Sequence, residues 1–220
     1  NGYYSGGSTN TNNYAWMWKR APGYFDVVAY NGTGSAKTES HNLGVAPEMI
    51  WVKCRNAAED WNVYHKDLGS GKYLVLNKTD AEATATSKWN DTDPTASVFS
   101  LGTHINVNGS GKTYVAYLFS SLAGVSKVGS FTATGNDVDV DCGFSNGARF
   151  VLIKRTNSAD DWFVFDTVRG IVAGNDKRLK LNATTAEAAA DNIDPLSSGF
   201  TMTSGILGSS GNTFIFYAIA

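Results

Sequence analysis

Short runs of β-branched and aromatic residues recur along the chain, and most of them have the length of a β-strand. Residues of these types favour strands, and Asn-Gly pairs of the kind found in tight hairpins punctuate the chain at 31–32, 108–109 and 146–147. One Ala- and Glu-rich stretch, 184–192, lacks an apolar stripe, so at most a turn or two of helix is expected there. The predicted strands include residues 25–30, 48–53, 61–65, 72–76 and 113–119.

The chain resembles itself at an offset of about 101 residues. The segment 51–64 lies over 152–165, which brings Trp61 onto Trp162 and Asp60 onto Asp161. We therefore predict two tandem homologous units of about 98 residues, 23–121 and 122–220. The same offset places the apolar residues 15–18 on the closing strand of the first unit. Residues 1–22 are accordingly expected to be a linker plus the last strand of a missing upstream unit.

Each unit is expected to be an all-β, jelly-roll-like sandwich. Seven or eight short strands in one sheet would leave a wet face and exposed edges, whereas two packed sheets bury both apolar faces.

Composition narrows the function classes. Hydrophobic residues make up 42% of the chain and charged residues 17%, so a packed core is expected rather than disorder. The net charge of −2 offers no basic stripe for nucleic acid. No apolar run has the length of a membrane-spanning helix, and no membrane insertion is expected.

Two loops carry fragments of catalytic motifs. Residues 143–147 fit the G-x-S-x-G nucleophile pattern, but a strand rather than a helix is predicted after Ser145, and all three histidines precede it. Residues 109–113 resemble a phosphate-binding loop, but they lack its first glycine and also precede a strand. We predict a protein that is not an enzyme and has no cofactor.

Asp137, Asp139 and Asp141 alternate along a predicted strand, which would place three carboxylates on one face. Carboxylate oxygens are ligands for calcium, but the spacing lacks the loop of a calcium-binding hand. A solvated strand face is the favoured interpretation, with a weak cation site as the alternative.

Aromatic and imidazole side chains are the other ligand candidates. Trp89 has no tryptophan counterpart in the second unit and is expected on a loop, so we predict a weak ligand site at Trp89, with His65 and His104. Trp61 and Trp162 instead indicate indoles on the core face beside an acidic turn residue, with stacking on sugar rings as the alternative. The two cysteines, Cys54 and Cys142, lie in apolar runs typical of free core thiols.

The chain resembles a tandem-repeat family of tail-fibre and virion-surface proteins of bacteriophages that infect aquatic bacteria, including cyanobacteria. The strings that carry the resemblance are FDVVAYNGTG at 25–34, HNLGVAP at 41–47, DWNVYH at 60–65, YLVLN at 73–77 and DWFVFD at 161–166.

The resemblance implies a non-enzymatic structural and adhesive module at a virion surface or in the extracellular space, such as a distal tail fibre or spike that attaches to a host. Its partners would be copies of itself, most simply in a homotrimer, other virion proteins and a host surface glycan. The alternative is a carbohydrate-binding module of a bacterial surface or secreted protein.

Overall fold

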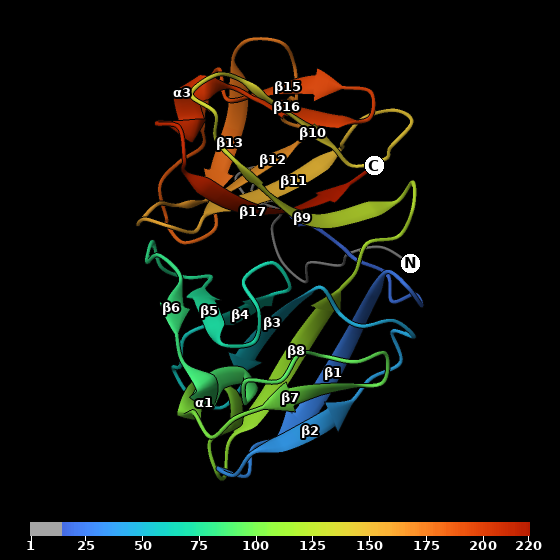
Figure 1. Cartoon of the computed structure of the whole chain (residues 1–220), viewed down its shortest axis with the longest axis vertical. Helices are drawn as coiled ribbons and strands as arrows, with labels where there is room; N and C mark the ends of the chain where they lie inside the picture. The colour runs from blue at the N-terminus through green and yellow to red at the C-terminus, as the bar shows by residue number, and fades with distance from the viewer. Residues whose placement is uncertain (1–14) are drawn as a thin grey trace, which may run out of the picture.

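The computed structural model describes residues 15–220, and this part of the chain is built almost entirely from antiparallel strands (Figure 1). The predicted all-β sandwich fold is confirmed. Residues 1–14, which belong to the predicted linker, lie outside the described residues.

The first half of the chain forms one six-stranded sheet and one two-stranded sheet. The small sheet pairs β2 (Lys37–Ser40) with β7 (Val98–Leu101). Two one-turn helices, α1 (Thr86–Trp89) and α2 (Ile105–Asn108), flank β7. The large sheet has the order β1 (Phe25–Asn31), β8 (Thr113–Phe119), β3 (Met49–Cys54), β4 (Asn62–His65), β5 (Lys72–Val75), β6 (Ala83–Thr84).

The second half has a large sheet with the corresponding order and a three-stranded small sheet. One helical turn, α3 (Ser204–Leu207), precedes the last strand. Strands at matching sheet positions are related by the sequence offset, while the descent of both halves from one repeat stays a prediction. The large sheet comprises β9 (Ser126–Thr132), β17 (Thr213–Ile219), β11 (Phe150–Arg155), β12 (Trp162–Asp166), β13 (Asp176–Lys180) and β14 (Ala188–Ala190); the small sheet comprises β10 (Val138–Asp141), β16 (Gly199–Met202) and β15 (Ile193–Leu196).

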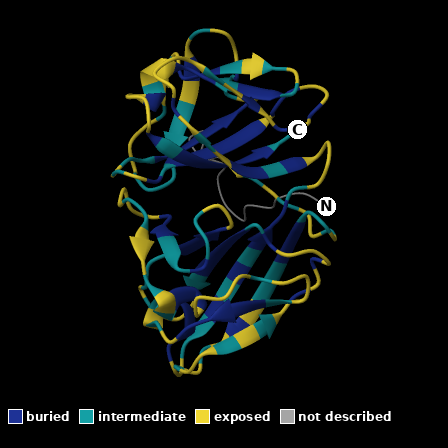
Figure 2. Ribbon diagram, in the orientation of Figure 1, coloured by how far each residue is buried: buried dark blue, intermediate teal, exposed yellow. Residues whose placement is uncertain are grey.

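The large sheets are buried on both faces, because a third core joins the two halves. Successive side chains of a strand point to opposite faces. In β3, Ile50 and Val52 pack into the core beneath the small sheet, whereas Met49 and Trp51 pack against the other half. From the second half, Phe150 of β11 enters the same middle core. Figure 2 shows the burial concentrated along the strands of both halves, with exposure in the loops.

A buried lysine ties the two halves together at one side of the middle core. Lys154, at the end of β11, is fully buried, and its Nζ donates hydrogen bonds to the carbonyl oxygens of Thr79 (2.9 Å) and Asp160 (2.7 Å). Burial lowers the pKa of Lys154 to about 8. The backbone N–H of Glu82 donates to the carbonyl of Thr156 across the same junction.

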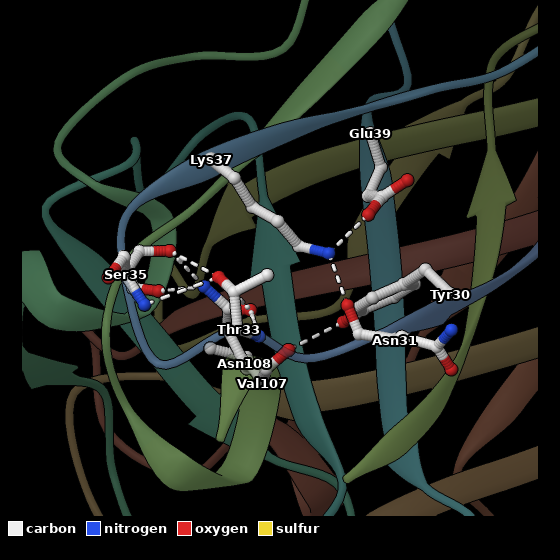
Figure 3. Close-up of polar contacts among 9 residues, drawn as sticks. Tyr30, Asn31, Thr33, Ser35, Lys37, Glu39, Val107 and Asn108 are labelled. Atoms are coloured by element: carbon white, nitrogen blue, oxygen red, sulfur yellow. Dashed lines mark hydrogen bonds and ion pairs between the residues drawn. The ribbon is translucent and has the colours of Figure 1, made fainter. Parts of the chain in front are cut away.

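The far end of the first half is held by a side-chain network rather than by the tight hairpin that the Asn-Gly pairs predict. Gly32 does not adopt a positive φ; it is required because a Cβ there would lie 2.1 Å from the carbonyl oxygen of Gly109. The buried Asn108 amide accepts from the N–H of Thr33 (2.9 Å) and donates to the carbonyl of Ser35 (2.7 Å), and Tyr30 donates to Val107 beside it (Figure 3).

Two short segments fold differently from what their local sequence pattern suggests. Tyr14 lies outside the described residues, and residues 15–20 form no strand in this structure, while the assignment of residues 1–22 to a missing upstream unit stays a prediction. Trp16 and Trp18 instead pack between the two halves of the same chain. The Ala- and Glu-rich stretch contains the short strand β14 and no helix.

Candidate functional site

A pocket of about 600 Å³ opens between the two large sheets. Its walls come from both halves and from the segment that precedes β1, and its lining is mainly apolar. Asn77 is the one residue of the lining that carries a side-chain amide. The lining comprises Trp16, Trp18, Phe25, Val27, Trp51, Trp61, Leu76, Asn77, Tyr117, Phe119, Phe150, Val164 and Leu181.

Three near-parallel rings form the wall contributed by the first half. Tyr117 of β8 lies 6.3 Å from Phe25 of β1 with an interplanar angle of 13°, and 6.1 Å from Trp61 with an angle of 20°, measured between ring centroids. Alternation along the strands turns these rings to the face that meets the second half. Trp61 and Tyr117 are only half-buried, whereas Phe25 is buried. We call Trp61, Tyr117 and Phe25 the aromatic platform.

A cage of four aromatic rings surrounds Trp18 next to this platform. The Trp18 ring centroid lies 5.9 to 6.3 Å from the centroids of Phe25, Trp51, Phe119 and Phe150. The contacts with Trp51, Phe119 and Phe150 are edge-on, a geometry that stabilises beyond the area it buries. Trp18 thereby bridges the two halves and forms part of the pocket wall.

Polar contacts fasten both ends of the Trp18 segment. Trp16 Nε1 donates to Asp166 Oδ2 (3.1 Å) in the second half, and Arg20 Nε donates to Asp26 Oδ1 (2.7 Å) in the first. Burial acts to raise the pKa of Asp26, but hydrogen bonds from the N–H groups of Asn42 and Val27 and from Arg20 outweigh it and lower the pKa. The segment is therefore held as a fixed wall of the pocket.

The polar groups beside Trp61 brace it from the outer side. Asn77 Oδ1 accepts from the Trp61 N–H (2.9 Å), and Asn77 Nδ2 donates to Asp60 Oδ1 (2.9 Å). Lys78 Nζ donates to Asp60 Oδ2 (2.7 Å), and this contact is the main cause that lowers the pKa of Asp60. The repeated Asp-Trp pair thus positions an indole at the pocket mouth.

The two tryptophans of the repeated pair differ in their surroundings. Trp162 is 1% exposed, and its Nε1 donates to the carbonyl of Val75 (3.0 Å) in the other half. Trp162 therefore fits the predicted indole on the core face. Trp61 is half-buried on the pocket, which fits the alternative of a ring available to a ligand.

Trp89 is not the exposed loop residue that the sequence indicated. It ends α1, is 2% exposed and packs in the core beneath the small sheet, where its Nε1 donates to the carbonyl of Lys72 (3.0 Å). The helical turn directs the Trp89 side chain into the core. The lack of a tryptophan at the matching position of the second half gave no indication of this burial. Trp89 is unable to stack on a ligand in this arrangement.

His65, His104 and Trp89 do not form one common site. His65 on β4 is fully buried on the face toward the second half, opposite to the Trp89 core, and burial lowers its pKa to about 4. His104 caps α2: its Nδ1 accepts from the N–H of Asn106 (3.1 Å) and lies 3.2 Å from Nζ of the buried Lys88. Burial, and then the charge of Lys88, lowers the pKa of His104.

The three aspartates at β10 are exposed, as the solvated strand face requires. Each carboxylate accepts from a different neighbour: Asp137 from the N–H of Ser204, Asp139 from the Thr201 hydroxyl and Asp141 from the N–H of Gly143. Residues 15–220 contain no group of three or more His, Cys, Asp or Glu side chains that could hold a metal ion. The weak cation site is therefore not supported.

The remaining candidates occupy loops or the core. Residues 143–147 connect β10 to β11, and residues 109–112 connect α2 to β8, so both lead into strands. Cys54 and Cys142 are buried and free, as predicted, and burial raises the pKa of Cys142 to about 12.

The pocket itself was missed by sequence reasoning, apart from the alternative role of Trp61. Trp16, Trp18 and Tyr117 were interpreted only as strand residues. The signal that could have revealed the pocket is the presence of aromatic residues at alternate positions of strands that are apolar on both faces. Once the strand register is known, Phe25, Trp51 and Tyr117 lie on the same face of the sheet.

The family of the chain can be stated from the comparisons with known proteins. Comparison with curated proteins gave no match, and comparison with solved structures gave none. In residues 15–220, no helix has the length and apolarity needed to cross a membrane. Residues 5–220, almost the entire chain, match the family described as Domain of unknown function (DUF7483). The chain therefore belongs to the DUF7483 family.

Proposed function

We propose that this protein is a non-enzymatic adhesive module of a virion surface, which attaches the particle to its host by binding a saccharide in the pocket between the large sheets. The aromatic platform is the observation that carries the proposal. Trp61 and Tyr117 are half-buried, near-parallel rings at the open side of an apolar pocket. Such rings offer flat apolar surface to the C–H face of a sugar, and their cost in side-chain entropy is small.

The position of these rings on a sheet supports binding. Tyr117 is held within β8 between β1 and β3, and the Asn77 amide fixes the backbone of Trp61. A ring that is already held in place loses little freedom when a ligand binds, so more of the contact energy appears as affinity.

The sequence resemblance to phage tail-fibre and virion-surface proteins supports the virion location. Under this proposal the partners are a host surface glycan, other virion proteins and further copies of the chain. A carbohydrate-binding module of a bacterial surface or secreted protein would use the same pocket, and the resemblance favours the virion.

A homotrimer is part of the proposal, because several weak saccharide sites on one particle bind together with high avidity. The mass of the purified protein in solution, measured by light scattering, tests it. A trimeric mass is expected, and a monomer at micromolar concentration contradicts it.

Binding to a glycan array and to host cells tests the saccharide site. Trp61→Ala and Tyr117→Ala are each expected to weaken binding more than tenfold, because truncating an aromatic anchor of a binding site commonly has this effect. Val168→Ala is the matched control, since Val168 is 91% exposed in the loop after β12 and does not line the pocket. Equal binding by all four proteins, or binding by none, contradicts the proposal.

A further inference from the structure

We propose that the pocket selects an acidic saccharide, with the sugar ring packed on Trp61 and its carboxylate bound by the ammonium of Lys53. This inference rests on the proposed function and adds the charge of the ligand.

Lys53 is not one of the residues that line the pocket, but its ammonium lies over the Trp61 ring, which does line it. In the pairing of β3 with β4, Val52 lies opposite Asn62, so the next positions bring Lys53 next to Trp61. The Nζ atom of Lys53 lies 6.0 Å from the centroid of the Trp61 ring. A carboxylate attached to a sugar that packs on this ring comes within reach of the ammonium.

The charges around the pocket mouth leave this ammonium in excess. Asp60 is paired with Lys78 at 2.7 Å, and Glu59 is paired with Lys112 at 3.0 Å. Lys53 donates only to the main-chain carbonyl of Glu59, and within residues 15–220 no carboxylate lies within ion-pair distance of it. The mouth beside Trp61 therefore favours an anion, although the chain as a whole carries a net charge of −2.

The matching lysine of the second half shows how the same position serves the fold alone. Lys154 lies on Lys53 at the sequence offset, but it is fully buried and donates to two carbonyls, one of them from the other half. Lys53 has a single carbonyl partner and is half-buried, so its ammonium has hydrogen-bonding capacity left for a ligand.

Matched saccharides that differ only in charge test the inference. A panel of oligogalacturonate, oligomannuronate and hyaluronan oligosaccharides is compared with the methyl esters of the same oligosaccharides, by titration calorimetry at low salt. The wild-type protein is expected to bind at least one acid roughly three- to tenfold more tightly than its ester, the range for a partly exposed charge-assisted contact. Added salt should reduce this preference, because the ammonium is reached by solvent.

Variants locate the charge effect. Lys53→Gln is expected to abolish the preference for the acid while leaving binding of the ester unchanged. Lys177→Gln on β13 removes one positive charge from the second half, where Lys177 pairs with Glu187 away from Trp61, and should keep the preference. If acids and esters bind equally and both are lost in Trp61→Ala, the inference fails and the saccharide site stands. If no saccharide on the array or the panel binds, both fail.

Discussion

Replacing Trp162 by Phe tests whether the middle core makes the two halves one folding unit. Trp162 belongs to the second half, yet its ring lies in the middle core and its Nε1 donates to the Val75 carbonyl of the first half. The matched variant is Trp61→Phe, which makes the same change at the corresponding position, on a half-buried ring at the pocket mouth.

The expected losses differ by several fold. Loss of the Trp162 hydrogen bond costs about 1 kcal/mol, because the Val75 carbonyl also accepts from the N–H of Lys78. The smaller ring leaves a void in the core that costs about 1–2 kcal/mol more. The sum, about 2–3 kcal/mol, corresponds to a fall in Tm of roughly 4–12 °C for a chain of this size. Trp61→Phe should cost less than about 1 kcal/mol.

Urea unfolding, followed by circular dichroism and by fluorescence, measures both variants against the wild-type protein. One transition shared by both probes is expected, shifted to lower urea in Trp162→Phe with an unchanged slope. Equal stability losses in the two variants would refute the reasoning. So would two separate transitions of which Trp162→Phe moves only one.

Burial and close main-chain packing lead to three further expected outcomes. Burial lowers the pKa of His65 to about 4, so the unfolded chain binds more protons than the folded chain between pH 6.5 and 4. The free energy of unfolding should therefore be highest above pH 6.5 and fall by at most about 3 kcal/mol as the pH drops to 4. Urea unfolding of His65→Asn over the same pH range should show a smaller fall. Cys54 and Cys142 should react with a maleimide only after unfolding, and fast labelling of the native protein, measured by mass spectrometry, would contradict their burial. Gly32→Ala should lower stability by more than about 2 kcal/mol in thermal unfolding, because its Cβ collides with main chain at Gly109; an unchanged Tm would contradict that close approach.

Strand positions could be predicted from the sequence because β-branched and aromatic runs and turn residues are local signals. The runs at 48–53 and 113–119 correspond to β3 and β8 within a residue. The sequence also indicates that these strands are buried on both faces. β3 is a nearly continuous apolar run, which is typical of a strand covered on both sides. Two independent sandwiches, as predicted, would bury one of these faces only, whereas the middle core buries the other as well.

The candidate site depends on long-range packing, which single residues do not reveal. Residues 15–18 are as apolar as a strand, but they form none, and the rings of Trp16 and Trp18 pack in the middle core between the halves. Trp89 lacks a counterpart in the second half, and this was taken as a sign of a ligand role. The α1 turn instead places it in a core, so absence from the other half carried no information about exposure.

The indole N–H signals of the six tryptophans, observed by NMR during titration with a bound saccharide, test the pocket most directly. The Trp61 signal should shift with saturation. The signals of Trp89 and Trp162 should stay in place, since their Nε1 atoms donate to the Lys72 and Val75 carbonyls away from the ligand. A saccharide that binds without moving the Trp61 signal, or that moves the Trp89 signal instead, would contradict the claim that the platform is the binding site.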